Sequence, residues 1–251
     1  ASAAHLRAPA DLFERVGFDQ NLGAQVPLDL RFRDAQGRTV RLGDYFDDRP
    51  VLLVLGYYRC PNLCGAVLDG VAQAVPGTRL GAGRQFEVID VSIDPDEGPA
   101  LAAAKQAGVA RRYPQAGAMR WHFLTGSAAA SSALAHAVGF RYYHDARNDQ
   151  YAHAAGIVVL TPDGQVARYL FGVQFPPQSL RFGLIEASSG RIGSLIDRLV
   201  LLCCDYDPST GRYSLLIGRI LAAACLATVL VLIGLVLGLQ RRARARSGAR
   251  P

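Results

Sequence analysis

The sequence predicts an α/β domain with a mixed sheet, followed by a single C-terminal transmembrane helix. Two observations support the α/β domain. Apolar runs typical of buried strands alternate with helical patterns, and a β-hairpin signal and a further helical pattern close the series. The third observation concerns the membrane: Ile220–Leu239 contains no charge and no proline over 20 residues. At about 1.5 Å per residue such a helix spans roughly 30 Å, the thickness of a bilayer's hydrocarbon core.

The elements follow from local patterns along the chain. Residues 1–25 are expected to form an irregular N-terminal arm, and a hairpin is expected from Leu28 to Leu42, where alternating residues flank a turn at residues 34–37. The acidic residues 94–97 are expected to begin the second helix, and Ser127 to cap the third. In order, the expected core elements are strand Val51–Leu55, helix Ala66–Val75, strand Phe86–Ile93, helix Glu97–Ala110, strand Arg120–Leu124, helix Ser127–Val138, the hairpin strands Ala155–Leu160 and Gln165–Phe171, and helices Pro176–Ala187 and Ile192–Leu202.

This order of strands and helices, with two cysteines at the first strand-to-helix junction, is that of a thioredoxin-like fold. The domain is expected over residues 26–205, a juxtamembrane linker over 206–219, the transmembrane helix over 220–239 and a basic tail over 240–251.

The net charge of +6 is concentrated in the tail. Five arginines between positions 241 and 250 leave residues 1–240 with +1, so a nucleic-acid-binding surface is not expected. The positive-inside rule places the tail in the cytoplasm. The N-terminal domain is then periplasmic and the chain spans the bacterial inner membrane once. A domain on that side requires an export signal, and we expect that one preceded Ala1.

The stretch Gly56–Gly65, GYYRCPNLCG, contains the cysteines of that junction. If the turn is helical, the i, i+4 spacing brings the sulfurs of Cys60 and Cys64 onto one face. The positive end of the helix favours thiolates. Two thiolates at a helix start either exchange with disulfides or hold a soft ion such as Cu(I). A structural disulfide and two buried thiols remain alternatives.

A soft ion on two thiolates needs a third donor, and the chain has five histidines. Solvated or packing roles are expected for His5, His122 and His136, and His144 is expected in a polar loop. His153 differs because it follows an irregular loop and directly precedes the apolar hairpin strand. In a thioredoxin-like fold that segment runs beside the cysteine turn. The residues alone leave ligation by His153 as one of two possibilities.

Three stretches in this order, GYYRCPNLCG, FEVIDVSIDPDE and YAHAAGIVVLTPDGQVARYLFG, resemble the SCO/SenC family of copper proteins. The resemblance extends from about Phe18 to Tyr213. It implies that Cys60, Cys64 and His153 bind copper, as Cu(I) with Cu(II) as an alternative oxidation state. Family members commonly carry Asp directly before the histidine. Ala152 stands there in this chain, so either Asp149 replaces that aspartate or the contact to the histidine is absent. The C-terminal anchor resembles a bacterial subgroup of the family.

The family's role implies a membrane-anchored periplasmic metallochaperone rather than an enzyme. The expected acceptor of the copper is the CuA centre of subunit II of a haem-copper oxidase, or another periplasmic cuproprotein. The same role implies a periplasmic protein that donates copper to this chain. The main alternative is a periplasmic thiol–disulfide oxidoreductase that uses Cys60 and Cys64 as a redox-active dithiol and does not need His153. A thiol peroxidase is disfavoured because Tyr57 stands where such enzymes carry threonine.

Overall fold

The structure is a computed structural model that describes residues 15–60, 63–192, 206–207, 212–213 and 228. Its contacts divide the chain into two units, Ala1–Ser194 and Leu195–Pro251. The predicted boundaries of the arm, the domain and the linker remain predictions.

A five-stranded mixed sheet in the order β10-β9-β4-β5-β6 forms the centre of the first unit. Strands β4 (Val51–Gly56), β5 (Glu87–Ser92) and β6 (His122–Leu124) are parallel, whereas β9 (Gly156–Leu160) runs antiparallel to both β4 and β10 (Val166–Phe171). Every residue of β4 and β5 is buried, because both faces of the sheet are covered. The predicted mixed sheet is confirmed.

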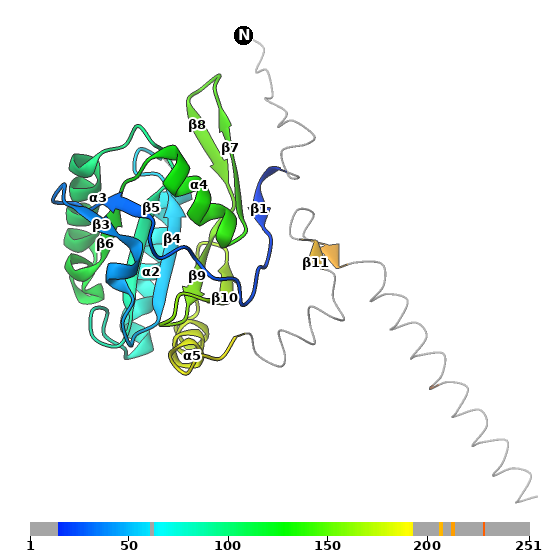
Figure 1. Cartoon of the computed structure of the whole chain (residues 1–251). Helices are drawn as coiled ribbons and strands as arrows, with labels where there is room; N and C mark the ends of the chain where they lie inside the picture. The colour runs from blue at the N-terminus through cyan, green and yellow to red at the C-terminus, as the bar shows by residue number, and fades with distance from the viewer. Residues whose placement is uncertain (1–14, 61–62, 193–205, 208–211, 214–227, 229–251) are drawn as a thin grey trace, which may run out of the picture. The chain divides into compact units, whose positions relative to one another are not determined.

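Helices lie on both faces of this sheet (Figure 1). On one face, Leu52 and Val54 share an apolar core with three helices, and on the other face Leu53 and Leu55 share a core with one helix and the first hairpin. The three helices are α2 (Leu63–Thr78), α3 (Pro99–Arg112) and α5 (Pro177–Ser188); the opposite face carries α4 (Ala128–Ala137) and the hairpin of β2 (Arg31–Arg33) and β3 (Thr39–Arg41).

A second, three-stranded sheet corrects two predictions. Strand β7 (Phe140–Asp145) pairs with β8 (Gln150–His153) and with β1 (Gly17–Phe18), all antiparallel. The loops predicted around His144 and before His153 are therefore wrong, and so is the irregular arm at Gly17–Phe18. The pattern was missed because the strands are only half buried and polar side chains interrupt the alternation. Figure 1 shows the β7–β8 hairpin projecting beyond the central sheet.

The helix starts also differ in detail from the predictions. Helix α2 begins at Leu63, so it includes Cys64 in its first turn. Helix α3 begins at Pro99 with Gly98 as its N-cap and no acidic residue in its first turn, so the predicted acidic helix start is wrong. The nearby Glu97 carboxylate instead accepts backbone N–H groups of the cysteine loop. The predicted cap of α4 is confirmed, because Ser127 accepts a hydrogen bond from the amide of Ala130.

In the second unit the structure describes one short antiparallel pair, β11 (Tyr206–Asp207) with β12 (Arg212–Tyr213), within the predicted linker. Nearly all of the predicted helix 192–202 and, apart from Thr228, the predicted transmembrane helix 220–239 lie outside the described residues. Within the described ranges, no helix is both long and apolar enough to cross a bilayer.

Candidate metal centre

Cys60 and Cys64 lie where β4 passes into α2, and both are thiols in the structure. Cys60 follows a turn in which its amide donates to the carbonyl oxygen of Tyr57 at 3.3 Å. Cys64 sits one helical turn later, and its amide lies 3.5 Å from the Cys60 sulfur. Cys60 is partly exposed, whereas Cys64 is only 5% exposed. One thiol is thus open to a partner and the other lies behind it.

The last residue of β4 leaves room for the inner cysteine. A Cβ atom on Gly56 would stand 3.2 Å from both the Cβ and the Sγ atoms of Cys64, which is closer than side chains normally approach. The backbone N–H of Tyr57 also donates to Cys64 Sγ at 3.4 Å. Glycine at position 56 and the turn after it therefore set the position of this sulfur.

His153 is the last residue of β8 and faces the inner cysteine. Its Nε2 atom lies 2.8 Å from Cys64 Sγ, and its Nδ1 atom lies 2.9 Å from the carbonyl oxygen of Ala154. Because a carbonyl oxygen only accepts, we assign the proton of the neutral ring to Nδ1. The lone pair of Nε2 then points at the sulfur. The metal-free pair is held by the Cys64 S–H donating to Nε2, and the same lone pair suits a metal ion.

The potential ligand atoms of Cys60, Cys64 and His153 all lie within 4.8 Å of one another. They form the one group of three potential metal ligands that the described part of the chain contains. Two soft thiolates and an imidazole match the preference of Cu(I) for few, soft ligands. The donor set therefore fits a copper site.

The family model for SCO1/SenC matches residues 19–181, which is more than half of the chain. The chain belongs to the SCO1/SenC family. A comparison with curated proteins finds no match.

Several solved structures share the fold of this SCO1/SenC protein. A protein of Aquifex aeolicus VF5 with a suggested role in electron transfer is 22% identical, with a TM-score of 0.59 over 68% of this chain and 96% of that one. Copper-bound ScoI of Arabidopsis thaliana is 16% identical, with a TM-score of 0.53 over 64% and 96%. BsSco, a Sco cytochrome c oxidase assembly protein with a disulfide switch, is 20% identical, with a TM-score of 0.51 over 69% and 98%. At these identities the likeness shows the thioredoxin-like fold of the domain.

A buried carboxylate holds the backbone just before Cys60. Glu97, which is 4% exposed, accepts hydrogen bonds from the amides of Tyr58 at 2.7 Å and Arg59 at 2.6 Å. The hydroxyl of Ser92 donates to the same carboxylate at 2.7 Å. The Arg59 side chain adds ion pairs with Glu97 and with Asp94. Sequence reasoning missed this role of Glu97, because its partners are backbone amides 38 and 39 residues away.

Burial dominates the electrostatics of the inner thiol. It raises the pKa of Cys64 well above that of an ordinary cysteine, although the N–H of Tyr57 acts in the opposite direction. The expectation that the helix start favours a thiolate is therefore wrong for metal-free Cys64, because desolvation of the sulfur outweighs the helix end. Metal binding has to remove this proton, so occupancy of the site depends on pH.

Aromatic rings surround the histidine. The Tyr57 ring packs edge-on to His153, with centroids 6.3 Å apart, and Phe140 lies 5.7 Å from it. Tyr151 contacts Tyr57 on the same side of the hairpin. His153 is therefore only 7% exposed, and its ring is held in one orientation by the packing as well as by Ala154.

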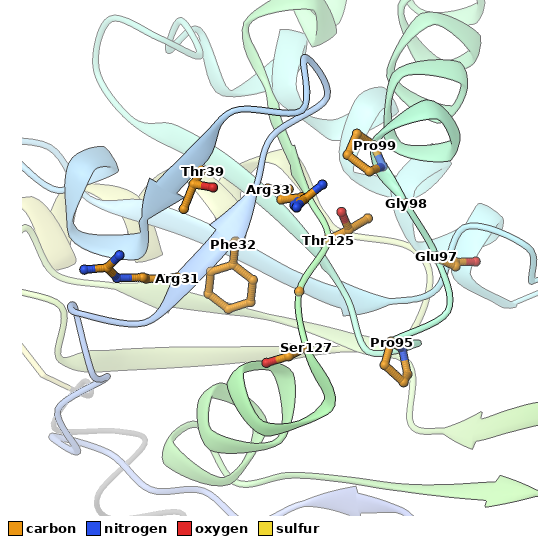
Figure 2. Close-up of a pocket in the computed structure, with 11 residues that line it drawn as sticks. Arg31, Phe32, Arg33, Thr39, Pro95, Glu97, Gly98, Pro99, Thr125 and Ser127 are labelled. Atoms are coloured by element: carbon orange, nitrogen blue, oxygen red, sulfur yellow. The ribbon is translucent and has the colours of Figure 1, made fainter.

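The pocket in Figure 2 is separate from these three ligands. It has a volume of about 430 Å³ and lies between the first hairpin and the starts of α3 and α4. Figure 2 shows Arg33 and Thr39 from the hairpin, Ser127 at the start of α4 and Pro99 at the start of α3, with Glu97 on its wall. Glu97 thus lies between the pocket and the cysteine loop. At the candidate metal centre itself only Cys60 is partly exposed, because Cys64 and His153 are buried.

The histidines at positions 122, 136 and 144 do not belong to the group of potential ligands. His144 pairs with Asp149 at 2.9 Å on the exposed hairpin, so the proposed replacement of the missing aspartate by Asp149 is wrong. The carbonyl of Ala154 takes that place at His153. His122 contacts Glu87 at 3.0 Å, and His136 is exposed on α4. His5 lies outside the described residues, and so do the three remaining cysteines of the sequence, Cys203, Cys204 and Cys225.

Proposed function

We propose that this SCO1/SenC protein is a copper metallochaperone that carries its cargo on Cys60, Cys64 and His153. The observation that supports this most is the convergence of the two sulfurs and the Nε2 atom within 4.8 Å. Copper is present in the Arabidopsis ScoI structure of the same fold. A trigonal site with one partly exposed thiolate suits transfer, because an acceptor's cysteines can displace the ligands one at a time.

The proposed acceptor is the CuA centre in subunit II of a haem-copper oxidase, with a periplasmic copper donor upstream. BsSco is a member of a family of cytochrome c oxidase assembly proteins, which supports this choice. We further propose that residues 220–239 anchor the protein in the bacterial inner membrane, with the domain in the periplasm and the tail in the cytoplasm. The anchor would raise the local concentration of the chaperone at the oxidase.

The topology has a direct test. Single-cysteine labels introduced at Ser247 and at Asp29 in a chain without its natural cysteines should differ in reactivity in intact cells. A membrane-impermeant maleimide should modify position 29 once the outer membrane is permeabilised, and position 247 only after the inner membrane is broken. Equal labelling of both positions would contradict the proposed orientation.

The ligand set is tested by anaerobic competition for Cu(I) between the full chain in detergent and a chelator. The wild type should bind one ion. The variant His153→Ala should lose more affinity than the roughly 10- to 100-fold that follows from removing a contact to a metal ligand. The variant His144→Ala is the matched control, because His144 belongs to the same hairpin but pairs with Asp149. Equal binding by wild type and His153→Ala would contradict the three-ligand site.

A thiol–disulfide oxidoreductase is the second candidate. The arrangement of a partly exposed Cys60 ahead of a buried Cys64 favours it, since the outer thiolate would attack an acceptor disulfide and the inner one would resolve the mixed disulfide. Such a reaction needs both cysteines and leaves a Cys60–Cys64 disulfide. If the protein reduces a disulfide substrate but does not take Cu(I) from the chelator, this function replaces the chaperone.

A further inference from the structure

Asp90 is an acid in the middle of the sheet, for which the metal site as described has no use. It lies on β5 between Val54 of β4 and Phe123 of β6, both of which are core residues. Its exposure is 2%, and its Oδ2 atom has no hydrogen-bond partner in the structure. A buried carboxylate without a paired charge destabilises the folded state, so Asp90 lowers the free energy of unfolding.

The position of Asp90 relates it to the inner cysteine. Alternate residues of a strand share a face, so Asp90 lies on the face that carries Val88 and α2. Its register partner Val54 is two residues before Gly56, the glycine against which Cys64 packs. From strand geometry the Cα atoms of Asp90 and Gly56 are about 8 Å apart. The Asp90 carboxyl and the Cys64 sulfur therefore lie on the same face of the sheet, over neighbouring strands.

The charged and titratable groups around Asp90 come from each element packed on it. Burial raises its pKa to about 7, Lys105 of α3 opposes that rise, and Glu97 adds to it. The Tyr58 hydroxyl donates to the carbonyl oxygen of Asp90 at 3.0 Å. Cys64 of α2 also interacts with this acid, because a negative charge on Asp90 contributes to the raised pKa of Cys64. A negative charge on Asp90 therefore makes it harder to remove the proton of Cys64.

We propose that Asp90 is the internal proton acceptor of the metal centre, taking up one proton when the two thiols become a copper dithiolate. This inference rests on the proposed function. In the metal-free protein the buried Cys64 keeps its proton, whereas Asp90 is ionised at alkaline pH. Binding of Cu(I) replaces two thiol protons by one positive charge, so the site gains a net charge of −1. One of the two protons released then stays on Asp90, and the other goes to solvent.

This coupling keeps the buried region from holding two negative charges at once. It also makes loading sensitive to pH in a specific way. Below the pKa of Asp90 the carboxyl is protonated with and without copper, and has no effect on affinity. Above it, loading has to protonate Asp90 or keep its charge beside the new anion. The wild type therefore gains less affinity with rising pH than a chain without this acid.

The test uses the full chain in detergent, Cu(I) as the probe, and three forms: wild type, Asp90→Asn, and Glu87→Gln as the control. Glu87 is a buried acid of the same strand, but it lies on the other face and pairs with Arg49 and His122. Infrared difference spectra at pH 8.5 should show the C=O band of a protonated carboxyl appearing on copper loading. The band should be present in the wild type and Glu87→Gln and absent from Asp90→Asn.

Competition with the chelator gives the second measurement. Asp90→Asn should match the wild type at pH 5.5 and bind about three- to tenfold more tightly at pH 8.5. Copper binding without the carboxyl band in the wild type would overturn this inference alone. So would an affinity ratio between the two forms that does not change with pH. If the wild type takes no copper from the chelator, the proposed function is wrong, and the inference falls with it.

Discussion

The Nε2 atom of His153 lies 2.8 Å from the sulfur of Cys64, although 89 positions separate the two residues in the sequence. Two sheets bring them together. Cys64 is placed by the end of β4 in the central sheet, whereas His153 ends β8 in the smaller sheet. The relative positions of the three ligand atoms therefore depend on how the β7–β8 hairpin packs against the cysteine turn.

Gly56→Ala should displace the sulfur of Cys64 from its position in the metal centre. Its new Cβ would stand 3.2 Å from Cys64 Sγ, so either the sulfur or the strand has to move by a few tenths of an ångström. We expect Cu(I) affinity to fall about tenfold and the free energy of unfolding by about 1–3 kcal/mol. Chelator competition and chemical denaturation measure the two effects.

Gly65→Ala is the matched control for that change. It adds the same methyl group next to Cys64, but apart from the chain neighbours and the backbone of the same helix no atom lies within 4 Å of the new Cβ. Since Gly65 lies inside α2, alanine should stabilise the protein by up to about 1 kcal/mol and leave copper affinity unchanged. Equal losses of affinity in both variants would show that the contact with Gly56 does not position the sulfur.

Glu97→Gln should loosen the turn before Cys60. The amides of Tyr58 and Arg59 would exchange a carboxylate for a neutral amide side chain, which weakens both hydrogen bonds. We expect the free energy of unfolding to fall by about 1–3 kcal/mol and copper affinity by about 10-fold or more. Asp96→Asn, an exposed acid one residue earlier, should change neither quantity. A stability loss with unaltered copper affinity would make Glu97 purely structural.

The two thiols should differ in reactivity in the metal-free protein. Cys64 is buried and its pKa is raised, so at pH 8 it is a protonated, shielded thiol. Iodoacetamide should modify Cys60 at least about tenfold faster, as followed by mass spectrometry of the separate peptides. Raising the pH through 9 and beyond should accelerate modification of Cys64. Similar rates for both cysteines at pH 8 would contradict the buried position of Cys64.

Asp90 should also affect folding stability through pH. The pKa of its carboxyl is about 7 in the folded protein and near 3.8 in the unfolded chain. Between these values the folded state binds more protons than the unfolded state, so the free energy of unfolding falls as the pH rises from about 4 to 7. The full shift corresponds to a loss of the order of 4 kcal/mol.

Asp90→Asn should remove this part of the pH dependence. The stability difference between the variant and the wild type should move in the variant's favour by a few kcal/mol between pH 4.5 and pH 8, as measured by urea unfolding in detergent. This comparison of two pH values cancels any constant cost of the asparagine itself. A difference that stays constant over that range would mean that Asp90 titrates normally.

Much of this protein could be predicted from local sequence. The apolar strand before GYYRCPNLCG, the helical pattern after it and the turn Thr161–Gly164 indicated the central sheet and the position of both cysteines. Such elements are predictable because their signals are contained in a few neighbouring residues.

Only the tertiary structure decided how distant groups act on the cysteine turn. The half-buried strands β7 and β8 have a weak alternation, so their pairing, and with it the approach of His153 to Cys64, depends on packing between sheets. Glu97 is held at the cysteine turn because its carboxylate accepts hydrogen bonds from two backbone amides there, and it does not cap the helix that it precedes. The sequence by itself determined which ligands are available. Burial, which no local pattern measures, decided the protonation of Cys64.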